Sequence, residues 1–215
     1  MKIKVTKGVI LSVLGCLAPM IPGALLYGRL PERMATHFDL NNVPNGYSSK
    51  IVALFGIPLF ILVMDIFVYF MLENDPKKRG VSKAIKGAVL ACMPILSIIT
   101  QGMIIGVGLG ISVDIGRILP ALIGVLFIVI GNYLPKCRQN YTAGIRLPWT
   151  LHSEENWNRT HRLAGKLWVI AGAGMILAGI FKIGQAQWFL LIPACVIPAV
   201  YSYWFYRKEA KQEKN

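Results

Sequence analysis

The sequence predicts an all-α integral membrane protein with six transmembrane helices and both termini in the cytoplasm. Three observations lead to this fold class. Hydrophobic residues make up 55% of the 215 residues and charged residues only 15%, against roughly 25% in soluble domains. The apolar residues fall in blocks of about 17–25, the length needed to cross a hydrocarbon core. The basic residues gather between these blocks. A soluble enzyme, a disordered chain and a disulfide-stapled secreted domain are all excluded.

Six apolar blocks are predicted to cross the membrane, at 8–27, 51–72, 84–109, 118–134, 163–181 and 188–206. They divide the chain into an N-terminal part, 1–80, with an outer loop at 28–50, and a C-terminal part, 81–215, with a cytoplasmic loop at 135–162. The third block is long enough to tilt in the membrane.

The 23 Lys and Arg residues set the orientation. Eighteen lie in the N-terminal segment, the second and fourth loops and the C-terminal tail, and five lie in the other three loops. Cytoplasmic loops carry the positive excess, so both termini are predicted to be cytoplasmic. We interpret the net charge of +13 as this bias plus attraction to anionic membrane lipids, and not as direct binding of nucleic acid.

The first apolar block allows two other interpretations. Lys2–Lys7 before an apolar run resembles a signal peptide, and the residues up to Cys16 loosely resemble a lipoprotein box. The run continues to Tyr27, too far for a cleaved signal, which favours a retained first span. The cysteines, Cys16, Cys92, Cys137 and Cys195, are interpreted as packing residues because they lack disulfide or metal spacing.

Small residues and prolines inside the spans predict how the helices pack. Gly102, Gly106 and Gly110 form two G-x-x-x-G steps in the third span, and Gly174 and Ala178 form a similar pair in the fifth. Such faces let helices approach closely. The prolines within spans predict kinks that free backbone carbonyls; they are Pro58, Pro94, Pro193 and Pro198.

Asp65 and Gln101 are polar residues inside predicted spans. A charge at that depth is costly, so Asp65 is expected to face inward and either find a partner, such as Lys86 or Lys166, or remain protonated. A proton or ligand site and a structural hydrogen bond both remain open for Asp65. A structural role is favoured for Gln101.

The outer loop contains Pro44-Asn45-Gly46, a combination typical of turns. A compact reversal is expected there. It would project outward the side chains that are candidates for ligand binding: His37, Phe38, Asp39, Asn45 and Tyr47.

The cytoplasmic loop leads directly into the fifth span. Ser153 is a predicted N-cap, Glu155 and Arg159 form an i, i+4 pair, and the helix is expected to continue unbroken into the membrane. Trp149 and Trp157 suit the membrane interface. Arg146 is predicted to tie this loop to carboxylates or helix carbonyls through its planar fork of donors.

Catalytic and cofactor motifs are not found in the sequence. His37, His152 and His161 lack the spacing of metal ligands or of a catalytic triad. No enzyme activity, metal or cofactor is therefore predicted.

The two loops resemble the SdpI family of bacterial immunity proteins. The outer loop resembles the family's DUF1648 element in Leu30-Pro31-Glu32, His37-Phe38, Pro44-Asn45-Gly46 and Lys50. The cytoplasmic loop resembles the C-terminal signature in Gly131-Asn132, Leu134-Pro135-Lys136, Asn140, Gly144-Ile145-Arg146, Pro148-Trp149-Thr150-Leu151, Trp157, Thr160-His161-Arg162 and Gly165. Leu147 departs from the pattern, where Thr is expected.

The resemblance implies a six-span membrane protein that protects its bacterium against a secreted toxic peptide. It also implies a receptor role, in which sensing of the toxin leads to capture of a cytoplasmic transcriptional repressor. The outer-loop residues named above would sense the toxin. The signature loop would carry the response through Asn140, Arg146, Pro148, Trp149, Trp157, His161 and Arg162, and the glycine-lined third span is the element expected to move.

Two other function classes are suggested by parts of the sequence. A peptide or small-molecule transporter is suggested by Asp65 and the kinked spans, but no inverted repeat is visible. An intramembrane enzyme is suggested by the three histidines, but they form no catalytic constellation. The leading hypothesis is a binding and sensing protein whose output is immunity.

Overall fold

The computed structural model describes residues 5–39, 42–77, 83–183 and 186–212. Within them, six helical segments are long and apolar enough to span a membrane: Lys7–Leu25, Val52–Glu73, Ala84–Gly108, Ile115–Lys136, Glu154–Ile180 and Gln187–Gln212. The predicted spans are thus confirmed. Five basic residues used in the charge count lie outside the described residues: Lys2, Lys4, Lys78, Arg79 and Lys214.

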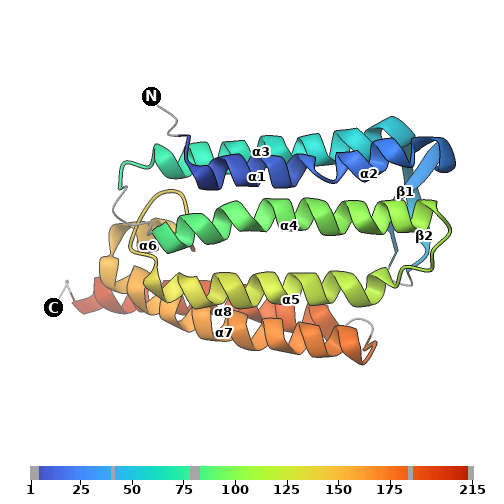
Figure 1. The fold of residues 1–215 in the computed structure, drawn as a ribbon. Coiled ribbons are helices and arrows are strands. Elements are labelled where there is room, and N and C mark those ends of the chain that lie inside the picture. Colours follow the sequence, from blue (N-terminus) through green and yellow to red (C-terminus); the bar gives the residue numbers. More distant parts are fainter. Residues whose placement is uncertain (1–4, 40–41, 78–82, 184–185, 213–215) are drawn as a thin grey trace. The chain divides into compact units, whose positions relative to one another are not determined.

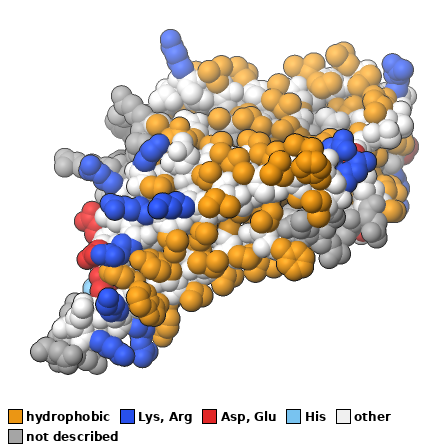
Figure 2. Space-filling model, turned by 90° about the horizontal axis from the view of Figure 1, so that it is seen from below, with side chains coloured by type: hydrophobic (Ala, Val, Ile, Leu, Met, Phe, Trp, Pro, Cys, Tyr) orange, Lys and Arg blue, Asp and Glu red, His pale blue; other side chains and the backbone are white. Residues whose placement is uncertain are grey.

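The outer faces of the helices are apolar. Figure 2 shows hydrophobic side chains along the helices, with Lys and Arg gathered toward their ends. Phe60 is 64% exposed and Phe189 is 78% exposed. Large apolar patches of this kind on a soluble monomer would be unusual, and they match a surface solvated by lipid.

The chain forms two compact units. Unit 1 comprises Met1–Glu73 and Lys86–Gly116, and unit 2 comprises Asn74–Ile85 and Arg117–Asn215. Most of the third span therefore belongs with the first two, although the sequence places a boundary near residue 80. The division into family parts at that boundary stays a prediction.

Unit 1 contains the first three spans and a β-hairpin (Figure 1). Its elements are α1 (Lys7–Leu17), α2 (Met20–Leu25), η1 (Tyr27–Arg29), β1 (Arg33–Phe38), β2 (Pro44–Ser49), a π-helix η2 (Val52–Gly56), α3 (Ile57–Glu73) and α4 (Lys83–Gly108), whose first turn lies in unit 2. The first span is broken between α1 and α2, where Pro19 precedes the second helix. The side chain of Thr6 caps α1 by accepting a hydrogen bond from the Val9 N–H.

The outer loop is an antiparallel β-hairpin, and its turn lies earlier than predicted. Pro44-Asn45-Gly46 belongs to β2, and the chain reverses between Asp39 and Val43. Pro44 opens the strand, where a missing N–H is tolerated. Gly46 lies opposite His37, whose Cβ is only 2.7 Å from the place a Cβ of residue 46 would take. The sequence therefore needs glycine for close strand contact and not for a turn.

The core of unit 1 joins the hairpin to the spans. It consists of Leu30, Met34, Ala53, Leu54, Ile104 and Ile105, all buried. Met34 is 1% exposed, and its side chain reaches Gly108 at the end of α4. This anchoring explains why a loop between two spans is regular and ordered.

Within unit 1, the glycines of the third span do not form the predicted helix-packing face. Gly110 lies beyond α4 with φ of +79°, and Ile111 N–H donates to the Gly106 carbonyl at 2.9 Å, the pattern of a Schellman cap. Gly106 faces Val113, and a Cβ on Gly102 would meet nothing within 4 Å. Within unit 1, these residues give no support to the hypothesis that α4 slides along a glycine face.

Unit 2 contains the last three spans and the signature loop. Its elements are α5 (Ile115–Tyr133), whose first residues lie in unit 1, η4 (Leu134–Lys136), α6 (Pro148–His152), α7 (Glu154–Ile180) and α8 (Ala186–Gln212). Ser153 caps α7 by accepting from Asn156 N–H, and Arg159 pairs with Glu155 at 2.7 Å, as predicted. The helix runs unbroken from this cap through the fifth span, also as predicted.

Close packing through glycine occurs between α5 and α7. A Cβ on Gly124 would lie 2.5 Å from the Gly172 carbonyl, and a Cβ on Gly172 would lie 2.4 Å from the Gly124 carbonyl. Seven residues away on each helix, Gly131 and Gly165 meet in the same way. The sequence signal for this contact was a pair of glycines seven residues apart in each of the two spans. Residues seven apart lie on the same face of a helix, because seven residues make about two helical turns.

Candidate functional site

The signature loop is organised around the buried side chain of Asn140. Its Nδ2 donates to the carbonyls of Arg138 at 2.9 Å and Ala143 at 3.0 Å, and to Cys137 Sγ at 3.2 Å. Its Oδ1 accepts from the backbone N–H groups of Thr142 and Ala143. Asn140 is fully buried, so one amide satisfies the backbone of a segment that lacks regular structure.

Asp75, which lies before the third span in the sequence, stabilises this loop by hydrogen bonds. Its Oδ2 accepts from Tyr141 N–H at 2.9 Å and from the Thr142 hydroxyl at 2.6 Å, while Oδ1 accepts from Lys77 N–H. The Lys77 ammonium donates to Gln139. Asp75 is 2% exposed. Sequence reasoning missed it, because its partners in the loop, Tyr141 and Thr142, lie more than sixty positions further along the chain.

Trp157 and His161 form the floor of the loop. His161 Nε2 accepts from Ile145 N–H at 3.0 Å, so Nδ1, 2.8 Å from the Trp157 carbonyl, carries the proton. The two rings stack at 4.0 Å, and the Trp157 indole donates to the Cys137 carbonyl. Gly144, at φ +116°, leaves room for the imidazole. Trp157 is fully buried, so its indole packs within the protein and does not lie on the surface; its depth at the membrane interface stays a prediction.

Trp149 connects α6 to α8 by a hydrogen bond and by ring packing. Its indole donates to Ser202 Oγ at 2.6 Å, and its ring packs against Tyr203 and Tyr206. The Ser202 hydroxyl donates in turn to Asn156 Oδ1, and Asn156 Nδ2 donates to the Ser202 carbonyl. Three helices, α6, α7 and α8, therefore meet at one buried polar cluster.

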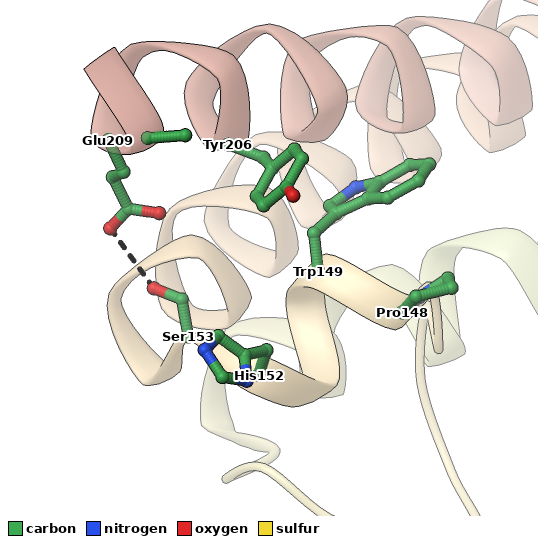
Figure 3. Close-up of a pocket in the computed structure, with 7 residues that line it drawn as sticks. Pro148, Trp149, His152, Ser153, Tyr206 and Glu209 are labelled. Carbon is green, nitrogen blue, oxygen red and sulfur yellow. Dashed lines mark hydrogen bonds between the residues drawn. The ribbon is translucent and has the colours of Figure 1, made fainter. Parts of the chain in front are cut away.

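An open cleft lies beside this cluster. It measures about 800 Å³ and is lined by Pro148, Trp149, His152, Ser153, Tyr206, Glu209 and Ala210. Figure 3 shows the aromatic side chains of Trp149 and Tyr206 on one side and the hydroxyl of Ser153 bonded to Glu209 on another. The cleft combines aromatic surface with an acidic side chain.

Arg146 and Arg162 are exposed. The type of hydrogen-bond acceptor predicted for Arg146 was wrong. Arg146 Nη1 donates to the backbone carbonyl of Tyr141 at 2.7 Å. The acceptor belongs to the same loop, where a carboxylate or a helix carbonyl was expected. Arg162 lies on the exposed side of α7.

Cys137 is a buried thiol in the middle of this network. Burial raises its pKa and the charge of Asp75 adds to this, while the hydrogen bond from Asn140 partly opposes them. The thiol therefore stays protonated at neutral pH. A protonated thiol suits its position, because Sγ lies 3.7 Å from the carbonyls of both Arg138 and Ala143.

The exposed face of the hairpin in unit 1 presents most of the other predicted residues. His37 Nδ1 donates to Asn45 Oδ1 at 2.5 Å, and both side chains are exposed together with Tyr47. Phe38 and Asp39 are half-buried, and Asp39 Oδ1 accepts from Val43 N–H within the reversal. The hairpin thus holds His37, Asn45 and Tyr47 in fixed positions.

Lys50 is a buried residue that sequence reasoning did not select. Its ammonium pairs with Glu32 at 2.9 Å, donates to the Tyr27 carbonyl and lies 4.5 Å from the centre of the Tyr27 ring. It fixes the base of the hairpin to η1. The only available signal was its place in the DUF1648-like pattern.

Asp65 has a different partner from those predicted. It is 2% exposed, and its Oδ2 lies 2.6 Å from Ser12 Oγ. Lys86 forms an ion pair with Glu73 instead, and Lys166 is exposed on α7. Gln101 is also buried, and its Nε2 donates to the Leu54 carbonyl in the π-helix at 3.3 Å.

The histidines form no common site. His37 belongs to the hairpin, His152 is exposed beside the cleft, and His161 is buried beneath the loop. Among the residues that the structure describes, no group of three or more His, Cys, Asp and Glu side chains could hold a metal ion.

Comparisons with known proteins find matches for two segments of the chain. Residues 136–206 match the SdpI/YfhL protein family, and residues 14–62 match a domain of unknown function, DUF1648. The chain is 29% identical over 205 residues to "Immunity protein SdpI" of Bacillus subtilis (strain 168), covering 94% of this chain and 97% of that protein. No solved structure matches it.

The DUF1648 match contains the hairpin, and the SdpI/YfhL match contains the signature loop, α6, α7 and most of α8. The resemblance predicted from the sequence is therefore confirmed, and the chain is a multi-pass cell membrane protein in which a segment that matches DUF1648 precedes one that matches the SdpI/YfhL protein family.

Proposed function

We propose that this protein is an immunity protein that protects its bacterium against a secreted toxic peptide. The observation that carries the proposal is the similarity to "Immunity protein SdpI", which extends over 94% of this chain. Similarity over nearly the full length includes both the hairpin and the signature loop, so it supports a shared function better than a match to one domain would.

The proposed orientation places both termini and the signature loop in the cytoplasm and the hairpin outside. It rests on the distribution of basic residues. In this orientation a peptide that arrives from outside first meets the hairpin, and a cytoplasmic response leaves from the signature loop.

The exposed face of the hairpin is the proposed contact for the toxin. His37, Asn45 and Tyr47 are exposed there, while the core around Met34 holds the strands in place. A preordered surface loses little conformational entropy when a peptide binds, which favours affinity. Tyr47 is 52% exposed, and tyrosine is among the residues that contribute most to binding.

The cleft of unit 2 is the proposed contact for a cytoplasmic repressor. Trp149 and Tyr206 supply aromatic surface of the kind enriched at interfaces. Glu209 supplies negative charge, which complements the basic surface that a DNA-binding protein carries. Capture of the repressor would then depend on the Trp149 cluster that joins α6 to α8.

Deletion of the gene in its own bacterium tests the immunity role. The deletion strain should be killed by culture supernatant of the parent strain, and expression of the wild-type chain should restore survival. Variants His37→Ala and Tyr47→Ala should lose at least tenfold in survival at normal membrane abundance, with the exposed hairpin residue Ser49→Ala as the matched control. Equal survival of deletion and parent strains would refute the immunity role.

The repressor arm needs a separate readout. A small DNA-binding protein encoded beside the gene should move to the membrane fraction when toxin is added, and Tyr206→Ala should abolish this shift while survival persists. If Tyr206→Ala recruits the protein as well as wild type does, the cleft is not its binding site. Toxin flux into proteoliposomes would favour the transporter alternative.

A further inference from the structure

A buried polar group in unit 1 joins three spans within the membrane-spanning region. Ser12 Oγ of α1 lies 2.6 Å from Asp65 Oδ2 of α3 and 2.7 Å from the backbone carbonyl of Leu90 in α4. Ser12 is 3% exposed and Asp65 is 2% exposed. Asp65 lies two helical turns before the end of α3, about 12 Å from it at 1.5 Å per residue.

The Leu90 carbonyl needs a donor from outside its own helix. In an α-helix this carbonyl would accept from the N–H of the residue four positions later, and that residue is Pro94, which has no N–H. The proline therefore leaves the carbonyl unpaired at a depth where water is scarce. An unsatisfied backbone group in such a place is costly. Ser12 is placed to satisfy it.

The number of hydrogens available for these two contacts determines the protonation state of Asp65. The serine hydroxyl has one hydrogen and two oxygen neighbours at hydrogen-bonding distance. If Asp65 is ionised, the hydrogen can serve the carboxylate or the carbonyl, and the other acceptor is left without it. If Asp65 is protonated, its O–H donates to Ser12 Oγ, and the Ser12 O–H donates to the Leu90 carbonyl. Only the second arrangement uses both short contacts as hydrogen bonds.

We propose that Asp65 is a proton-binding site at neutral pH, at the head of a relay that runs from its carboxyl O–H through Ser12 to the Leu90 carbonyl. The proton comes from water, and its binding removes one negative charge from the interior of the spans. The link between α1, α3 and α4 then depends on one proton. This site is separate from the toxin-binding and repressor-binding surfaces proposed above.

The neighbouring ionisable groups do not replace that proton. On α1, Cys16 is buried one turn after Ser12, and Lys7 is exposed. On α3, Tyr69 lies one turn after Asp65, and its phenol is neutral at neutral pH. On α4, Lys86 lies one turn before Leu90 and its charge is paired with Glu73, while Cys92 carries no positive charge.

Infrared difference spectroscopy of the full chain in lipid nanodiscs tests the protonation state directly. Wild type minus Asp65→Asn at neutral pH should show a carboxylic-acid C=O band. Ser12→Ala should move this band to higher frequency, because the acid loses its acceptor. A difference spectrum that contains only carboxylate bands would overturn the proposal.

Pro94→Ala separates the relay from a merely buried acid. The alanine keeps the Cβ of residue 94, which is the atom nearest to the place a Cβ of residue 15 would take. It also restores the N–H that can pair with the Leu90 carbonyl. Ser12 is then free to donate to the carboxylate, so the acid band should titrate away at lower pH than in wild type. An unchanged titration midpoint would overturn the relay.

Thermal unfolding gives a second readout on the same samples. A folded state that binds one more proton than the unfolded chain loses stability as pH rises. The melting temperature of wild type should therefore fall from neutral to alkaline pH, and Asp65→Asn should remove the part of that fall that belongs to Asp65. The same pH slope in both proteins would contradict proton binding. None of these measurements involves toxin, so their failure is distinct from failure of the immunity role.

Discussion

At the scale of single residues, Asn140 shows how one side chain can organise an irregular loop. Its amide donates to two carbonyls and a sulfur and accepts from two backbone N–H groups. Buried groups that lose such partners cost roughly 1–3 kcal/mol each. The stability of unit 2 should therefore be very sensitive to this position.

The isosteric variant Asn140→Asp should destabilise the protein by about 2–4 kcal/mol, because it replaces a donor with an acceptor that faces two carbonyls. Denaturant unfolding in detergent micelles measures this difference. Tyr141→Phe is the matched control, since the ring of Tyr141 is 47% exposed. Equal stability of Asn140→Asp and the control would show that the loop does not depend on this amide.

Cys137 should be a poor nucleophile. Burial raises its pKa, and the thiolate is the reactive form. In a variant that keeps Cys137 as its single cysteine, the rate of maleimide modification should stay low at neutral pH. The rate should rise only above the pH near 8.5 at which a free thiol ionises, and unfolding should restore ordinary reactivity. Modification of folded protein at the rate of a free cysteine would rule out the protonated, buried thiol.

At the scale of elements, the spans and the α7 cap were predictable and the contacts between elements were not. Apolar length and the Ser153, Glu155 and Arg159 pattern depend on neighbours in the sequence. The hairpin depends on Met34 reaching the core, and its turn was misplaced because Pro44-Asn45-Gly46 also fits the start of a strand. Ser12 and Asp65 are 53 positions apart in the sequence, and no local sequence pattern predicts such a contact.

The glycine contact between α5 and α7 gives a prediction for elements. Gly172→Ala would place a Cβ 2.4 Å from the Gly124 carbonyl, so the helices must separate. Overpacking of this kind costs typically about 1–3 kcal/mol. Gly102→Ala meets open space and should be neutral or slightly stabilising, since alanine favours helix by about 1 kcal/mol. Unfolding in sodium dodecyl sulfate titrations compares the two, and equal midpoints would argue against tight packing at Gly172.

At the scale of the whole molecule, the family resemblance was readable from the sequence because the signature loop is long and its residues are distinctive. The reasons for that signature became clear only in the structure. Gly144 makes room for His161, Trp149 bonds to Ser202, and Asn140 satisfies the loop. Asp75, outside the signature and before the third span, completes the arrangement, which a reading of the loop alone could not find.

The orientation of the whole molecule is the last prediction, and it follows from the positions of basic residues. The structure guides the choice of labelling sites. Thr150 is fully buried and unsuitable, whereas Asn45 in the hairpin and His152 beside the cleft are exposed. The native Cys195 is exposed on α8 and should be replaced by serine in each variant. A membrane-impermeant maleimide should label Asn45→Cys in intact cells, and it should label His152→Cys only after permeabilisation. Labelling of His152→Cys in intact cells would reverse the orientation and remove the basis for assigning the hairpin to toxin and the cleft to a cytoplasmic partner.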